Sequence, residues 1–223
     1  MKHVLQIISE IFLILFYPIS SLIANLIPKN KLEGKGDGKT IVIVERWLSK
    51  NIKHIQWKSY LEKRGFRVYL ANFSLYKGDF EESARDLEMY INKRNLKNII
   101  LVGISSGALT GLLYLQEHDG WENVDRFVTI GAPFKGTPTA YNLSFLYSGR
   151  QLLPKSSLIK KINNYKIKNL DRIYCFRATF DEMVPKGTVL PGSHEMRINA
   201  IGHNNLHLGI GRTYERIADL ARG

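Results

Sequence analysis

Six short apolar runs alternate with stretches of helical periodicity over residues 40–222, and this alternation constrains the fold more than any other feature. The apolar runs are rich in Ile and Val, as expected of strands buried on both faces of a sheet. They are residues 40–44, 67–71, 98–102, 125–130, 173–178 and 195–200. Helical spacing occurs at 52–64, 80–94, 107–117 and 206–222. The sequence therefore predicts the α/β class, with a doubly wound, mostly parallel six-stranded sheet.

Residues 133–168 interrupt this alternation. They carry prolines, glycines and apolar side chains in mixed order, among them Tyr141, Phe145 and Tyr147. A long insert placed directly after a strand often forms a lid or one wall of a binding site. A loop whose own helix packs onto the core is the alternative. We expect a lid-like insert at 133–168 inside a domain that spans residues 40–223.

The first 30 residues are mostly apolar, although Gln6, Glu10, Asn25 and Pro18 interrupt them. About 20 helical residues suffice to cross a bilayer, and no small-x-small cleavage site follows the apolar stretch, which disfavours a signal peptide. A membrane anchor and an amphipathic helix packed on the domain remain. We favour the anchor, because Lys29, Lys31 and Lys35 can contact anionic headgroups. We predict a membrane-associating segment at residues 1–30 that gives the protein a membrane localisation. The sequence does not indicate which side of the membrane the protein faces.

A segment rich in glycine and lysine, residues 31–39, follows the apolar segment. Glycine-rich segments behave as flexible linkers. We therefore expect the linker to separate residues 1–28 from the folded domain, so that removing them leaves catalysis intact.

The chain is strongly basic, with 32 Lys and Arg against 20 Asp and Glu and a net charge of +12. Such a field attracts anionic lipid or nucleic acid. The basic residues are scattered and match no nucleic-acid-binding motif, so a membrane surface is the expected partner and nucleic acid is not. A solvated basic surface without a partner is the alternative. The single cysteine excludes an intramolecular disulfide, and no Cys/His spacing suits a structural zinc site.

Residues 103–107 read Gly-Ile-Ser-Ser-Gly and match the nucleophile-elbow pattern Gly-x-Ser-x-Gly. The motif follows the predicted strand at 98–102 and precedes the predicted helix at 107–117. At such a turn the serine has a strained backbone, and the flanking glycines lack the Cβ atoms that would collide with the neighbouring strand and helix. This context predicts that Ser105 is a nucleophile.

A serine hydroxyl needs an imidazole to take its proton and a carboxylate to orient that imidazole. Asp181 directly follows the fifth predicted strand, and His203 follows the sixth. Carboxyl ends of parallel strands meet at one edge of the sheet, so both side chains should emerge beside Ser105. Glu182 is the alternative acid. His207, inside the predicted final helix, is the alternative base, and we expect it to be a surface residue or a neighbour of the base.

Two further blocks carry a resemblance to a known family. Residues 131–137 read Gly-x-Pro-x-x-Gly-Thr after the fourth predicted strand, and Gly202-His203 closes the last one. With the elbow, these blocks resemble the small lipases and esterases of the α/β-hydrolase superfamily over about residues 40–220. The resemblance implies that Ser105, Asp181 and His203 are catalytic and that the backbone N–H of Ser106 is one oxyanion donor. It implies no metal or organic cofactor.

The chain departs from these lipases after the first predicted strand. It has Glu45-Arg46-Trp47 where they usually carry His-Gly, and the second oxyanion donor maps onto the N–H of Trp47. Losing one such donor costs about a hundredfold or more in rate. We expect a carboxylic ester hydrolase acting on a lipid-like ester. Acyl transfer by the same triad and a non-catalytic membrane- or protein-binding module are the alternatives. Acyl length and oligomeric state stay open.

Overall fold

A computed structural model describes residues 3–12, 32–45, 52–71 and 78–223. Six strands form one sheet in the order β2-β1-β3-β4-β5-β6, and every neighbouring pair is parallel. The strands are β1 Thr40–Val44, β2 Arg67–Ala71, β3 Ile99–Ile104, β4 Val124–Ile130, β5 Ile173–Phe180 and β6 His194–Ile201. The predicted six-stranded α/β architecture is confirmed.

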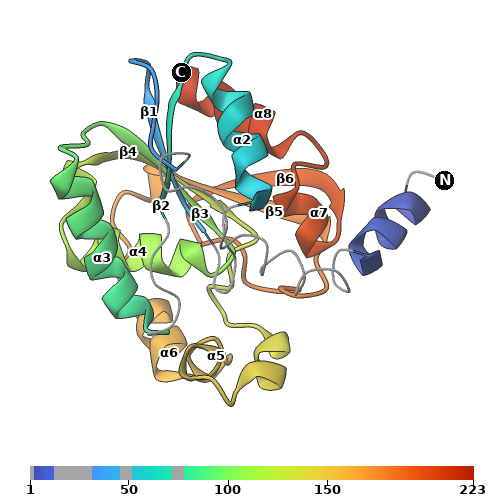
Figure 1. Ribbon diagram of the computed structural model, residues 1–223. Helices are drawn as coiled ribbons and strands as arrows, with labels where there is room; N and C mark the ends of the chain where they lie inside the picture. Colours follow the sequence, from blue (N-terminus) through green and yellow to red (C-terminus); the bar gives the residue numbers. More distant parts are fainter. Residues whose placement is uncertain (1–2, 13–31, 46–51, 72–77) are drawn as a thin grey trace.

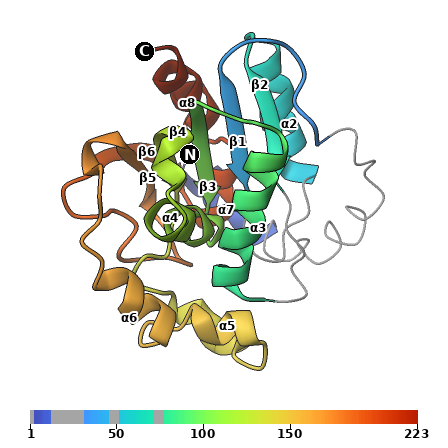
Figure 2. The ribbon, with the colours of Figure 1, turned by 90° about the vertical axis from the view of Figure 1, so that its left-hand side faces the viewer.

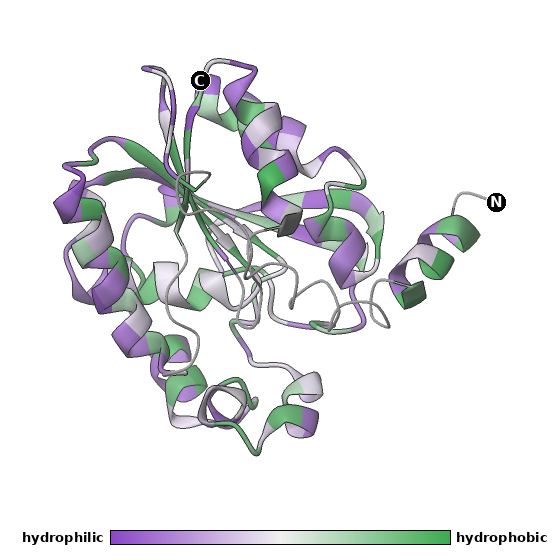
Figure 3. Ribbon diagram, in the orientation of Figure 1, coloured by the Kyte–Doolittle hydropathy of each residue, from purple (hydrophilic) through white to green (hydrophobic). Residues whose placement is uncertain are grey.

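Helices cover both faces of the sheet (Figure 1). The longer ones are α2 Ile52–Glu62, α3 Phe80–Lys93, α4 Gly107–Glu117 and α8 Thr213–Arg222. Alternate residues of β1 enter different cores: Val42 and Val44 pack with α3 and α4, whereas Ile41 and Ile43 pack with α2 and α8. The central strands are therefore apolar on both sides, and α3 shows hydrophobic and hydrophilic residues along its length (Figure 3).

The insert at 133–168 contains three short helical elements. They are η4 Pro138–Leu143, α5 Tyr147–Gln151 and α6 Ser157–Asn163. Leu158, Ile159 and Ile162 of α6 join the core on the α3–α4 face, so part of the insert packs onto the domain. Figure 2 places α5 and α6 at the end of the molecule opposite α8. Phe145, between η4 and α5, is 74% exposed. A role as a lid stays a prediction.

The carboxyl-terminal helix differs from the prediction of one helix at 206–222. The structure has a short helix, α7 His203–His207, and then α8. Gly209 and Gly211 between them have φ angles of 81° and 82°. Positive φ is incompatible with a continuing right-handed helix, so the chain must turn there.

The predicted membrane localisation is wrong. Within the ranges that the structure describes, no helix is long and apolar enough to cross a membrane. Residues 3–12 form a helix beside α7 (Figure 1). Its buried Gln6 and Glu10 bond to the β6–α7 turn, which contradicts the expected separation of this segment from the domain. The rest of the predicted segment, with Lys29, lies outside the described residues.

Candidate active site

The turn between β3 and α4 holds Ser105 in a left-handed conformation with φ of 50°. A Cβ on Gly103 would lie 2.5 Å from Cα of Ala108, and one on Gly107 would lie 2.4 Å from the carbonyl oxygen of Val44. Real Cβ atoms do not approach other atoms so closely. Both glycines of the motif are therefore needed for strand, turn and helix to pack, and the serine is left at the apex of the turn.

Three side chains from separate segments that follow β3, β5 and β6 form one hydrogen-bonded chain. The Oγ atom of Ser105 lies 3.0 Å from Nε2 of His203, and Nδ1 of His203 lies 2.7 Å from Oδ2 of Asp181. His203 and Asp181 are buried, at 1% and 7% exposure. Serine, histidine and aspartate follow β3, β6 and β5 respectively, so the structure brings together the three residues that the sequence singled out.

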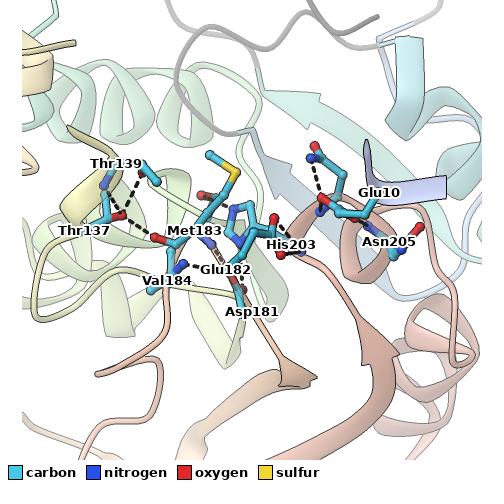
Figure 4. A network of polar contacts seen from close by, with 11 residues as sticks. Glu10, Thr137, Thr139, Asp181, Glu182, Met183, Val184, His203 and Asn205 are labelled. Carbon is cyan, nitrogen blue, oxygen red and sulfur yellow. Dashed lines mark hydrogen bonds and ion pairs between the residues drawn. The ribbon is translucent and has the colours of Figure 1, made fainter. Parts of the chain in front are cut away.

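The surroundings of Asp181 determine the tautomer of His203. The other carboxylate oxygen of Asp181 accepts hydrogen bonds from the backbone N–H groups of Met183, at 3.0 Å, and Val184, at 2.7 Å (Figure 4). These donors hold the carboxylate with Oδ2 facing the imidazole. Because a carboxylate only accepts, Nδ1 of His203 must carry the proton. We therefore assign Nε2 as the acceptor for the hydroxyl of Ser105.

The two alternative residues take other positions. The carboxylate of Glu182 accepts the backbone N–H of His203, at 3.2 Å, rather than facing its imidazole. His207 is 2% exposed, so it is not a surface residue, and its ring packs edge-on against that of His203 with centroids 4.2 Å apart. Asp181 and His203 therefore have the geometry of acid and base, and Glu182 and His207 contact His203 from its backbone and ring sides.

Burial, opposed by a backbone hydrogen bond and reinforced by the nearby carboxylates of Glu10 and Asp181, raises the pKa of Glu182 to about 6. The folded protein holds the proton of Glu182 more tightly than the unfolded chain, whose carboxyl has the ordinary pKa of 4.5. The stability gained from this proton is therefore fully present below pH 4.5 and is lost as the pH rises through about 6. Stability should therefore fall across this window because Glu182 ionises.

We expect Glu182→Gln to raise the Tm at pH 7.5 by about 2 °C and to leave it nearly unchanged at pH 4.5. Glutamine stays neutral and still offers an oxygen to the N–H of His203. The effect is modest because the side chain is half-exposed and solvent screens it. Thermal unfolding of both proteins at the two pH values measures it. An equal Tm difference between the two proteins at both pH values would contradict the raised pKa of Glu182.

Of the two predicted oxyanion donors, Ser106 lies within the described residues. Ser106 is the buried residue that opens α4, where the helix dipole places partial positive charge beside Ser105. Trp47, the predicted second donor, lies outside the described residues. Just before it, the carboxylate of Glu45 contacts Nδ1 of buried His54 at 2.6 Å, a pair that sequence reasoning missed. In the described part of the chain, no group of three His, Cys, Asp or Glu could hold a metal.

Comparison with known proteins bears on the fold. Residues 47–151 match a family model for the alpha/beta hydrolase fold. The chain has the alpha/beta hydrolase fold. A search of curated protein sequences finds no match.

Solved structures share this alpha/beta hydrolase fold at low sequence identity. The mature lipase BlEst2 of Bacillus licheniformis is 15% identical with a TM-score of 0.67, over 84% of this chain and 94% of the lipase. The esterase EaEST of Exiguobacterium antarcticum is 17% identical with a TM-score of 0.63, over 86% and 94%. A bromoperoxidase of Bacillus anthracis is 16% identical with a TM-score of 0.62, over 86% and 94%. The fold alone therefore does not separate esterase from peroxidase chemistry.

Proposed function

We propose that the protein is a serine hydrolase that cleaves carboxylic esters through an acyl-enzyme. The observation that carries the proposal is the continuous chain from Ser105 through His203 to Asp181, with Ser105 at a strained turn. The lipase and esterase among the structural neighbours support the same chemistry.

In the first half of the reaction, Oγ of Ser105 attacks the ester carbonyl carbon while Nε2 of His203 takes the hydroxyl proton. Asp181 stabilises the imidazolium that forms. The backbone N–H of Ser106 stabilises the negative oxygen of the tetrahedral intermediate. The intermediate collapses, the carbon–oxygen bond of the ester breaks, and His203 protonates the departing alkoxide to release the alcohol.

Water then attacks the acyl-enzyme. His203 takes one proton from this water, and a second tetrahedral intermediate forms at the same carbon. Its collapse breaks the bond to Oγ of Ser105, which recovers the proton from His203. The carboxylic acid leaves and the free enzyme is regenerated.

A lipid-like ester is the substrate class that we propose. Tyr141, Phe145 and Tyr147 of the insert expose large apolar surface that an acyl chain can cover. The insert connects to the loop carrying Asp181, because the hydroxyl of Thr137 donates to the carbonyl of Met183 (Figure 4). We propose that this exposed apolar surface, on an insert that contacts the acid loop, covers the acyl chain of the substrate.

A fluorophosphonate probe tests the proposal directly. We expect covalent labelling of the wild type at Ser105, because the probe reacts with a serine only when a base activates it. Intact-protein mass spectrometry followed by peptide mapping would locate the adduct. Absence of labelling in a folded sample, or labelling at another serine, would refute the proposed function.

A further inference from the structure

Helix α7 begins at the proposed base, His203, and has no capping side chain of its own. Its N-cap residue is Gly202, with φ of 105° and no side chain to accept a hydrogen bond. The first backbone N–H groups of a helix have no partners within the helix, and a capping side chain normally satisfies some of them. The acceptors for α7 must come from elsewhere in the chain.

Two carboxylates from distant segments supply these acceptors. Glu10 accepts the backbone N–H groups of Asn204 and Asn205, each at 2.8 Å, one at each carboxylate oxygen. It also accepts the side-chain amide of Asn204 at 2.6 Å. Glu182 accepts the N–H of His203 itself. The first three N–H groups of the helix are thus received by two acidic side chains, as Figure 4 shows for Glu10 and Glu182.

Further contacts hold residues 3–12 on the same turn. Ile201, just before Gly202, donates its N–H to the side chain of Gln6 at 2.9 Å. The side chain of buried Asn205 receives the hydroxyl of Ser9 at 3.0 Å and donates to the carbonyl of Gln6 at 2.7 Å. These residues of the amino-terminal helix are three and four positions apart and so share one face. The segment therefore holds the backbone on both sides of Gly202.

Gly202 is matched to the carboxylate of Glu10. A Cβ at this position would lie 2.3 Å from Oε2 of Glu10, inside any allowed contact distance. Any other residue would therefore displace the carboxylate as well as strain a φ of 105°. The glycine that precedes the proposed base makes room for a group that arrives from the far end of the sequence.

We propose that Glu10 is a positioning residue that holds His203 in line with Ser105 and Asp181. Glu10 acts through the backbone of α7. This inference rests on the function proposed above. Hydrogen bonds to an ionised acceptor are about twice as strong as neutral ones, and a negative charge at a helix N-terminus is favourable. A base must hold its geometry to about 0.5 Å to act. Loss of the anchor on the backbone of His203 should therefore lower kcat.

The test compares full-length Glu10→Gln and Glu10→Ala with Ile8→Ala, a control on the same helix whose side chain is exposed. Glutamine keeps one acceptor oxygen but loses the charge and the second acceptor. We expect kcat for a short p-nitrophenyl ester, per active site titrated with a fluorophosphonate, to fall about tenfold or more in the alanine variant. Glu10→Gln should be intermediate, KM should change less than about twofold, and Ile8→Ala should match the wild type.

Normalising to titrated sites separates positioning from folding. A purely structural role would lower the Tm and the number of active sites but leave kcat per site unchanged, and that result would overturn the inference. Should the wild type itself not react with the probe, the proposed function fails. Hydrogen exchange at the backbone amides of Asn204 and Asn205 then tests whether the carboxylate of Glu10 binds these N–H groups. Exchange faster in Glu10→Ala than in Ile8→Ala supports the cap, and equal exchange refutes it.

Discussion

Replacing Ser105 by alanine should lower kcat for a short p-nitrophenyl ester on the order of 10⁴-fold or more, with little change in the Tm. The hydroxyl is the proposed attacking group, and its oxygen lies within hydrogen-bond distance of Nε2 of His203. Alanine removes only the oxygen of a half-buried side chain, so the fold should persist. Steady-state kinetics with circular dichroism and thermal unfolding on the same samples measure both effects.

Ser83→Ala is the matched control, because Ser83 lies on α3 and its hydroxyl donates to the carbonyl of Asp79. It should keep the wild-type rate. If the folded Ser105→Ala variant retained most of the wild-type activity, Ser105 would not be the nucleophile and the acyl-enzyme mechanism would have to be withdrawn.

Replacing His203 by alanine should lower kcat about a thousandfold or more. The imidazole is the group that bridges Ser105 and Asp181, at 3.0 Å and 2.7 Å, so its loss disconnects the serine from its proton acceptor. The fluorophosphonate labelling rate should fall with kcat, because both depend on the same activated hydroxyl. The pair of measurements distinguishes loss of activation from loss of substrate binding.

His207→Ala provides the comparison, since this second buried histidine touches the ring of the first. We expect a loss of less than about tenfold, through looser packing around His203 rather than loss of the proton acceptor. A variant with a cavity here will also be less stable, so rates are compared on folded protein. The reverse ranking of the two histidines would reassign the base to His207.

Much of the site was predictable because its signals are local. Each strand shows itself as a run of Ile and Val, and the elbow is five consecutive residues whose glycines are required by contacts within one strand, turn and helix. Asp181 and His203 could be placed beside Ser105 because carboxyl ends of parallel strands converge. In the structure the side chain of His203 bonds to both Ser105 and Asp181, whereas Glu182 bonds to the backbone of His203.

Other features carried local signals that the prediction misinterpreted or did not use. Gln6 and Glu10 looked like polar interruptions of an apolar segment, and a membrane anchor was the wrong conclusion. Their spacing of four residues, which places two polar side chains on one helix face, was the available indication of a buried contact. The break between α7 and α8 could have been inferred from Gly209 and Gly211.

By itself the sequence determined how strands and helices succeed one another along the chain, and which residues follow β3, β5 and β6. Those features depend on neighbours in the chain and on the general geometry of parallel sheets. Only the tertiary structure decided that Glu10 caps α7 and that His207 packs on His203. Glu10 lies 194 residues from Asn204, so no periodicity or motif links them. A carboxylate becomes a helix cap only where folding brings unpaired N–H groups within reach and a glycine leaves room for it.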